Sequence, residues 1–319
     1  MSNTQKKNVP ELRFPEFEGE WEEKQLGNII KVNSGKDYKH LDKGDIPVYG
    51  TGGYMTSVSE PLSEIDAVGI GRKGTINKPY LLEAPFWTVD TLFYCTPKKE
   101  TDILFILSLF RKINWKVYDE STGVPSLSKQ TINKINRFVP TNKEQQKIGK
   151  FFSKLDRQIE LEEQKLELLQ QQKKGYMQKI FSQELRFKDE NGNDYPDWTN
   201  ERLGEVTTVT MGQSPKSVNY TDNSNDTVLI QGNADIENGL INPRIYTREV
   251  TKLIQKDEII LTVRAPVGKL AMAQINACIG RGVCSIKGDK FLYYFLEWFA
   301  TQNKWIRFSQ GSTFESISG

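Results

Sequence analysis

The stretch Asn142–Phe181, NKEQQKIGKFFSKLDRQIELEEQKLELLQQQKKGYMQKIF, decides the fold because it has the pattern of one long α-helix. Apolar and aromatic residues recur in alternating steps of four and three, the spacing of a helix face that packs against another helix. Ten positions follow this spacing, and Glu162 and Lys173 are the interruptions among them. The other eight form the stripe: Ile148, Phe152, Leu155, Ile159, Leu166, Leu169, Tyr176 and Ile180. About 40 residues at about 1.5 Å each make a rod of about 60 Å. Such a helix is not stable alone in water, so we expect it to pack against a partner helix.

Length and composition exclude several classes of protein. The chain has 319 residues, which favours two or three domains. Residues 1–10 lack the apolar segment of an export signal, and no apolar run approaches the roughly 20 residues of a membrane span. Cys95, Cys278 and Cys284 have no C-x-x-C spacing, which argues against a zinc site and a disulfide framework. We therefore expect a cytoplasmic protein without a metal site.

The chain contains an internal repeat. Glu-Leu-Arg-Phe occurs at 11–14 and again at 184–187, and each copy is followed by a tryptophan and then, at the same spacing, a Leu-Gly pair. The repeated residues are Trp21 with Leu26-Gly27 and Trp198 with Leu203-Gly204. A β-branched run and a glycine with small polar neighbours follow each pair, at Ser34-Gly35-Lys36 and Gly212-Gln213-Ser214. Chance rarely gives such matches in the same order, so the chain consists of two related halves.

Each half predicts the same succession of elements. Short strands alternate with Gly/Pro/Asn turns, and an aromatic-rich helix follows them. The expected strands are 29–32, 46–49, 67–70 and 87–95, then 206–210, 228–231, 258–263 and 282–286; the expected helices are 102–117 and 290–308. The fold class is therefore α+β, with two homologous domains separated by a long coiled-coil-type helix. The expected boundaries are an N-terminal arm at 1–20, a first domain at 21–141, the helix at 142–181, a linker at 182–197 that repeats the arm, and a second domain at 198–319.

No motif in the sequence predicts catalysis. Residues 69–74, Gly-Ile-Gly-Arg-Lys-Gly, match the dinucleotide-binding fingerprint, but that motif needs a helix whose N-terminus holds the pyrophosphate. Pro79 and Pro85 exclude this helix, so a turn that presents Arg72 and Lys73 is the better interpretation. The sequence has no Walker loop, nucleophile elbow or paired-histidine metal motif. We predict no catalytic residue.

Basic side chains recur on the predicted turns, together with glycine and small polar residues. Such turns suit DNA, because backbone N–H groups approach phosphates while Arg, Lys, Asn and Gln reach base edges. The net charge is only +2, so a DNA-binding surface must be a local patch. Solvated loop charges are the alternative interpretation. Two similar modules joined by a stiff helix favour a two-part DNA site with a fixed gap.

At this point the chain resembles a known family, the specificity subunits of type I restriction-modification enzymes. The residues that carry the resemblance cover nearly the whole chain. They are the two Trp-x4-Leu-Gly segments, Val263-Arg264-Ala265-Pro266-Val267-Gly268, Ile279-Gly280-Arg281-Gly282, Glu144-Gln145-Gln146-Lys147-Ile148 and Leu155-Asp156.

The resemblance implies that each half is a target recognition domain reading one half of a split DNA sequence. The long helix would be the conserved spacer, and the chain itself would perform no chemistry and hold no cofactor. Modification subunits would supply the S-adenosylmethionine site for adenine methylation, and restriction subunits would supply ATP- and Mg-dependent translocation and cleavage. The resemblance, together with the basic and small polar residues on the predicted turns, implies a set of DNA-binding candidates in each domain. Those of the first domain are Lys36, Tyr38, Lys39, Arg72, Lys73, Thr75, Ser126 and Lys129, and those of the second are Gln213, Ser214, Lys216, Asn233, Arg264, Lys269 and Arg281.

The sequence departs from this family in one respect. Members of full length carry a second conserved helix after the second recognition domain, and we expect it to be absent here because the sequence stops at Gly319. The apolar stripe would then be satisfied by self-association or by helices of the modification subunits. Two other functions stay open: a coiled-coil scaffold without a DNA-reading role, and a stand-alone DNA-modifying enzyme.

Overall fold

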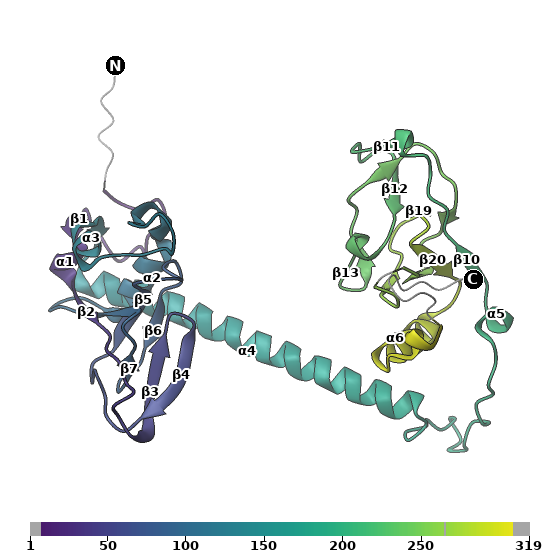
Figure 1. The fold of residues 1–319 in the computed structure, drawn as a ribbon, viewed down its shortest axis with the longest axis horizontal. Helices are drawn as coiled ribbons and strands as arrows, with labels where there is room; N and C mark the ends of the chain where they lie inside the picture. Colours follow the sequence, from purple (N-terminus) through teal and green to yellow (C-terminus); the bar gives the residue numbers. More distant parts are fainter. Residues whose placement is uncertain (1–7, 265, 309–319) are drawn as a thin grey trace. The chain divides into compact units, whose positions relative to one another are not determined.

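The computed structural model describes residues 8–264 and 266–308 and divides into two compact units, Met1–Lys165 and Leu166–Gly319 (Figure 1). Residues 1–7, 265 and 309–319, which the expected arm and second domain include, lie outside the described residues. The two units are called unit 1 and unit 2 below. Helix α4 (Asn142–Phe181) begins in unit 1 and ends in unit 2.

Unit 1 is an α+β domain with three sheets. Its elements are β1 (Glu22–Gln25), α1 (Leu26–Ile29), β2 (Ile30–Ser34), β3 (Lys43–Gly50), β4 (Gly53–Val58), β5 (Ala67–Gly71), β6 (Tyr80–Leu82), β7 (Trp87–Thr88), β8 (Leu92–Pro97), α2 (Ile103–Lys112), η1 (Trp115–Tyr118), α3 (Lys129–Lys134) and β9 (Asn136–Val139). The strand orders are β2-β8-β5-β6, β4-β3-β7 and β1-β9. The main core forms where α2, η1 and α3 pack their apolar residues against β2, β5 and β8.

Unit 2 is also an α+β domain, with two sheets. Its elements are α5 (Leu203–Val206), β10 (Val209–Met211), η2 (Ser217–Asn219), β11 (Tyr220–Thr221), β12 (Thr227–Ile230), η3 (Asn233–Asp235), β13 (Ile236–Glu237), β14 (Leu240–Ile241), β15 (Tyr246–Thr247), β16 (Leu253–Ile254), β17 (Ile259–Thr262), β18 (Leu270–Met272), β19 (Ala277–Ile279), β20 (Val283–Ile286), α6 (Lys290–Thr301) and η4 (Lys304–Phe308). One sheet has the order β10-β20-β17-β18-β14-β13 and the other β11-β15-β12-β19-β16.

The repeat is visible in the strand order and in the register. The order β2-β8-β5-β6 in unit 1 corresponds to β10-β20-β17-β18 in unit 2, and the parallel pair β3–β7 corresponds to β12–β19. Two glycines mark the same point in both units. A Cβ atom on Gly35 would lie 2.0 Å from the carbonyl oxygen of Val89, and one on Gly212 would lie 2.1 Å from that of Gly280. Only glycine permits this close backbone approach.

Several predicted elements differ in detail from the observed ones. Each Leu-Gly pair opens one helical turn, α1 or α5, before its strand, instead of leading directly into the strand. The expected strand 87–95 is two strands, β7 and β8, separated by the turn 89–91. The expected helix 102–117 ends at Lys112, because the indole N–H of buried Trp115 donates to the carbonyl oxygen of Phe110 (2.8 Å) and fixes a new turn. The segment 290–308 is likewise α6 followed by η4.

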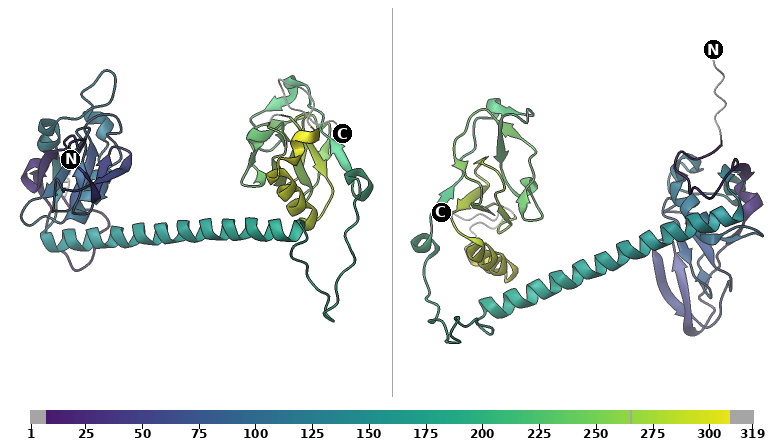
Figure 2. Two further views of the ribbon diagram at one scale, coloured as in Figure 1. Left: turned by 60° about the horizontal axis from the view of Figure 1, so that its bottom comes forward. Right: turned by 180° about the vertical axis from the view of Figure 1, so that it is seen from behind.

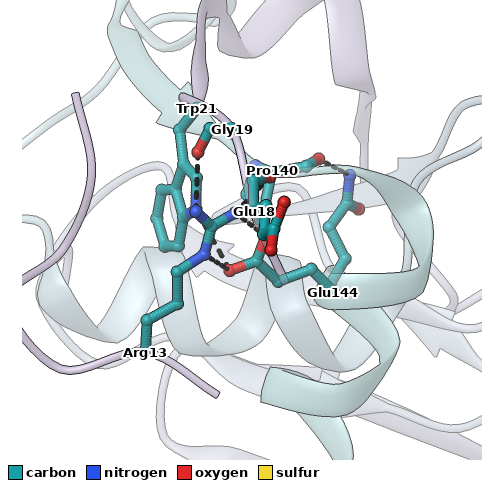
Figure 3. A network of polar contacts seen from close by, with 7 residues as sticks. Arg13, Glu18, Gly19, Trp21, Pro140 and Glu144 are labelled. Atoms are coloured by element: carbon teal, nitrogen blue, oxygen red, sulfur yellow. Dashed lines mark hydrogen bonds and ion pairs between the residues drawn. The ribbon is translucent and has the colours of Figure 1, made fainter. Parts of the chain in front are cut away.

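The start of α4 is held in unit 1 by two buried polar side chains of its first turn (Figure 3). Glu144 accepts hydrogen bonds from the guanidinium of Arg13 and from the indole N–H of Trp21 (3.2 Å). The Gln145 amide donates to the carbonyl oxygen of Pro140 (2.9 Å) and accepts from the backbone N–H of Asp102 (3.0 Å). The Glu-Gln pair that opens the helix is therefore a structural connection between α4 and unit 1.

The end of α4 is held in unit 2 by α6. The Gln178 side-chain oxygen accepts from the indole N–H of Trp298 (2.9 Å), and Lys173 pairs with Glu297 (2.9 Å). Phe181 packs edge-on against Phe295, with ring centroids 5.5 Å apart. Between these two ends α4 continues as one unbroken helix of 40 residues (Figure 2).

Six of the eight stripe residues are exposed in the single chain. Phe152 is 46% exposed and Ile159 57%, and Leu155, Leu166, Leu169 and Tyr176 are exposed as well. The other two, Ile148 and Ile180, are half-buried, and Ile148 packs on the core of unit 1. The interior of the stripe has large apolar side chains in contact with solvent.

Candidate nucleic-acid interface

In unit 1 the turn after β5 and the start of α3 bring four of the predicted residues together. Lys73 and Ser126 form an isolated antiparallel bridge, and the backbone N–H of Leu127 donates to the carbonyl oxygen of Arg72 (2.9 Å). The guanidinium of Arg72 lies 5.9 Å from the ring centroid of Phe93, and the ammonium of Lys129 lies 6.0 Å from the same centroid. Thr75 lies three positions after Arg72 in the connection between β5 and β6. Arg72, Lys73 and Lys129 are the cationic cluster of unit 1, and Ser126 and Thr75 lie on the loops beside it.

Residues 69–74 do not form a nucleotide site in this structure. Gly69 and Gly71 belong to β5, Gly74 has φ +88°, and the next element is strand β6. The turn that presents Arg72 and Lys73 is therefore confirmed. Lys129, which we expected on a turn, is instead the first residue of α3, because the Ser128 side chain caps this helix by accepting from the N–H of Thr131 (3.1 Å).

Asp119 holds the loop that carries Ser126. Its carboxylate accepts from the backbone N–H groups of Ser126 (2.9 Å) and Ser121 (3.0 Å). These hydrogen bonds, that of Ser126 first, lower the pKa of Asp119 because they stabilise the charged form. Sequence reasoning missed Asp119. Its signal was the segment Asp119-Glu120-Ser121-Thr122-Gly123, whose Asp, Ser and Gly favour side-chain-to-backbone turns.

Lys36, Tyr38 and Lys39 follow β2 in a separate loop. The backbone of Lys36 is fixed at both ends, since its N–H donates to the carbonyl oxygen of Thr88 (2.8 Å) and its own carbonyl accepts from the indole N–H of Trp87 (2.9 Å). Tyr38 packs against the small core around Trp87. The side chains of Lys36 and Lys39 are exposed.

In unit 2 four of the predicted residues line one recess of about 230 Å³. Its lining residues are Ser214, Gln231, Gly232, Asn233, Arg264, Arg281 and Gly282. The backbone N–H of Arg281 donates to the Ser214 hydroxyl (3.1 Å), which connects the two loops. Within residues 8–264 and 266–308, the guanidinium groups of Arg264 and Arg281 have no intramolecular partner. The recess therefore presents two uncompensated cations beside amide and hydroxyl groups.

The turn that carries Gln231 and Asn233 is held in place by hydrogen bonds to the side chains of Asp235 and Lys269. Asp235 is only 5% exposed and accepts from the N–H groups of Gln231 (2.8 Å) and Gly232 (3.1 Å). The ammonium of Lys269 donates to the carbonyl oxygens of Ile236 (2.6 Å) and Asn233 (3.2 Å). Lys269 is therefore engaged with the protein backbone. Gln231 and Asp235 were missed by sequence reasoning, which had no signal for their positions.

Gln213 and Lys216 lie on the loop after β10. The N–H of Gln213 donates to the carbonyl oxygen of Ile279 (2.9 Å), while the N–H of Lys216 donates to the carboxylate of Glu249 (3.1 Å). That hydrogen bond, together with one from the Asn219 amide, lowers the pKa of Glu249. Both Gln213 and Lys216 have exposed side chains.

Other chemistry is sparse in the described residues. They contain no group of three or more His, Cys, Asp or Glu side chains that could hold a metal ion. Cys95, Cys278 and Cys284 are buried, and burial raises the pKa of Cys284 to about 12, so its thiol stays protonated. Among the helices that are described, none is long and apolar enough to cross a membrane.

The chain is similar in sequence to proteins of a known family. Residues 18–171 and 195–319 match the family model described as type I restriction modification DNA specificity domain. A protein of Methanocaldococcus jannaschii assigned as the type I restriction enzyme MjaX specificity subunit is 29% identical over 231 residues, 68% of this chain and 54% of that protein. The MjaVIII specificity subunit of the same organism is 26% identical over 260 residues, 73% of this chain and 58% of that protein. The chain thus spans little more than half the length of these curated relatives.

A solved structure shows the same fold. The S subunit of a type I restriction-modification system from M. genitalium aligns with a TM-score of 0.63, at 15% identity, over 93% of this chain and 81% of that one. At this identity the likeness concerns the fold alone. The α+β class, the internal repeat and the long helix were all expected from the sequence, and they are confirmed. Because the family model covers most of both halves, the chain belongs to the type I restriction modification DNA specificity domain family.

Proposed function

We propose that this chain is the specificity subunit of a type I restriction-modification complex, and that each unit reads one half of a bipartite DNA target. The observation that carries the proposal is the pair of exposed basic sites, the cationic cluster of unit 1 and the Arg264/Arg281 recess of unit 2, in two units of one repeat. Arginine and lysine on rigid turns suit both phosphates and base edges.

The residues proposed to contact DNA are the exposed basic and amide side chains of these loops. Arg72, Lys73, Lys129, Arg264, Arg281, Asn233 and Ser214 lie in the two sites, while Lys36, Tyr38, Lys39, Thr75, Ser126, Gln213 and Lys216 lie on the adjoining loops. Lys269 would act by holding the turn of Asn233 and Ile236 in place.

In the same proposal, α4 is the spacer that fixes the distance between half-sites. Modification subunits would bind S-adenosylmethionine and methylate adenine, and restriction subunits would use ATP and Mg for translocation and cleavage. The chain itself would hold no cofactor and would act in the cytoplasm. The domain boundaries at residues 20, 141, 181 and 197 belong to this proposal, and family membership supports it.

The proposal is tested by expressing the chain with the modification subunits of its host and sequencing the methylated genome. We expect methylated adenines in one asymmetric bipartite sequence with a fixed unread gap. DNA retention without any shared sequence would instead support a non-specific binder. Absence of both retention and methylation would support the scaffold interpretation.

A further inference from the structure

Two turns occupy the same place in the repeat. The turn 89–91 joins β7 to β8 in unit 1, and the turn 280–282 joins β19 to β20 in unit 2. Val89 donates to the strand β3 residue Tyr49 (3.0 Å), as Gly280 donates to the strand β12 residue Ile230 (2.7 Å). The close glycine approaches at Gly35 and Gly212 are made to the first residue of each turn. The central residues of the two turns, Asp90 and Arg281, are therefore equivalent.

These equivalent positions carry opposite charges. Arg281 is exposed at the recess of unit 2, whereas three other arginines of that unit, Arg186, Arg244 and Arg248, pair with aspartates. Within the described part of unit 2, the positive charge of Arg281 is therefore not paired with a carboxylate.

Asp90 is exposed beside the cationic cluster of unit 1. Its backbone carbonyl oxygen, not its carboxylate, accepts a weak hydrogen bond from Arg72 (3.4 Å). A carboxylate at a surface that meets phosphates is repelled by them, so it weakens binding unless it accepts a hydrogen bond from the ligand. Base amino groups are the donors that DNA offers at such a place, and cytosine N4 is the one that carboxylates pair with in the major groove.

We propose that Asp90 and Arg281 are opposite specificity-determining residues of one repeated turn. Arg281 selects a guanine, whose O6 and N7 accept both arms of a guanidinium, and Asp90 selects a cytosine through its amino group. This inference rests on the proposed function, and it predicts that the two half-sites carry different bases at the position the turn reads.

The test selects bound duplexes from a library randomised in both half-sites, using the full chain with its modification subunits. Arg281→Lys keeps the charge but loses the bidentate geometry, and Asp90→Ala removes the acceptor. We expect Arg281→Lys to lower the preference for guanine at one position of one half-site about tenfold or more, and Asp90→Ala to do the same for cytosine in the other half-site.

Two controls match these variants. Arg248→Lys changes an arginine of unit 2 that already pairs with Asp226, and Asp45→Ala changes an exposed aspartate on β3 of unit 1. Both are expected to keep the wild-type consensus, and thermal melts check that all four variants fold. Because Arg281→Lys keeps the charge and most of the length of an exposed side chain, it reports on base selection without truncating the residue.

The outcomes separate this inference from the proposed function. If the wild type recovers no shared sequence, the proposed function fails. If the wild type recovers a bipartite sequence and both variants keep it with uniformly weaker binding, Asp90 and Arg281 do not select bases and this inference alone is overturned. A changed position in the half-site opposite to the mutated unit also overturns it.

Discussion

One guanidinium group, that of Arg13, donates to both carboxylate oxygens of Glu144, at 2.8 Å from Nε and 2.6 Å from Nη2 (Figure 3). Its other contacts are the carbonyl oxygens of Glu18 and Gly19. The repeated arginine, Arg186, makes the equivalent pair of contacts to the carbonyl oxygens of Tyr195 and Pro196. Arg13 therefore closes its own loop and binds the helix at the same time.

Replacement of Glu144 is expected to loosen the connection between α4 and unit 1. Glu144→Ala leaves the Arg13 guanidinium and the Trp21 indole N–H without their acceptor in a site where Glu144 is 1% exposed. We expect the melting temperature to fall by several degrees. Glu163→Ala, an exposed position of the same helix, is the control. Equal melting temperatures for both variants would show that the network adds nothing to stability.

Two glycines of α4 should respond in opposite directions to the same substitution. A Cβ on Gly149 would lie 2.6 Å from Asp102 Oδ1 and 2.8 Å from Leu104 Cβ, so Gly149→Ala should cost about 1–3 kcal/mol through overpacking. Gly175 has no atom within 4 Å of such a Cβ, so Gly175→Ala should stabilise by about 0.5–1 kcal/mol. Urea unfolding of both variants measures the difference, and a loss at Gly175 would contradict it.

Acid should loosen the loop 119–126. The lowered pKa of Asp119 means that its stabilising effect is complete above the usual value of 3.8 and is lost as pH falls through the lower folded value. We expect wild-type stability to drop below about pH 4. Asp119→Asn should be less stable at pH 7 and should have a shallower acid dependence. Thermal melts from pH 3 to 7 compare them, and parallel curves would contradict this role.

Arg264 and Lys216 should affect DNA binding in different ways. Arg264→Ala, if the side chain reads a base, costs about 1–3 kcal/mol on the cognate duplex and relaxes one position. Lys216→Ala, if the side chain contacts a phosphate, weakens all duplexes alike and lowers the salt slope by about 1. Binding to cognate and scrambled duplexes over a salt series separates the two. Identical losses for both variants on both duplexes would defeat the base-reading role of Arg264.

The exposed stripe of α4 should make the isolated chain associate. Leu166 and Leu169 are 56% and 52% exposed, and burying such side chains against a second helix removes apolar surface from water. We expect sedimentation to show concentration-dependent association, which Leu166→Glu with Leu169→Glu abolishes. Glu163→Gln changes an exposed residue of α4 outside the stripe and is the control, which should associate like the wild type. A sharp, concentration-independent monomer of the wild type would contradict this expectation.

The sequence predicts the repetitive parts of this fold well, because periodicity and spacing are local properties. The helix 142–181 has the bounds that its stripe and Pro140 indicate, and the Arg72/Lys73 turn follows from Pro79 and Pro85. Contacts between distant residues could not be predicted. The partners Arg13 and Glu144 are 131 positions apart in the sequence, and only tertiary packing makes Gln145 buried.

The candidate site was predictable at the level of loops rather than of side-chain roles. Turns that combine basic with small polar residues identified four of the residues that line the recess of unit 2, the basic Arg264 and Arg281 and the polar Ser214 and Asn233. They gave no indication that the Lys269 ammonium is taken up by two backbone carbonyl oxygens, since this depends on how the turn 231–236 folds over β18. Which of the candidate side chains contact DNA stays a prediction.

The close approaches at Gly35 and Gly212 involve only main-chain atoms on both sides, and the turns they support are completed by backbone hydrogen bonds. These contacts do not involve the side chains at positions 90 and 281. A single codon change at either position can alter recognition chemistry without rebuilding the protein around it. In this architecture, new target preferences can arise by stepwise mutation of exposed positions while Gly35 and Gly212 remain unchanged.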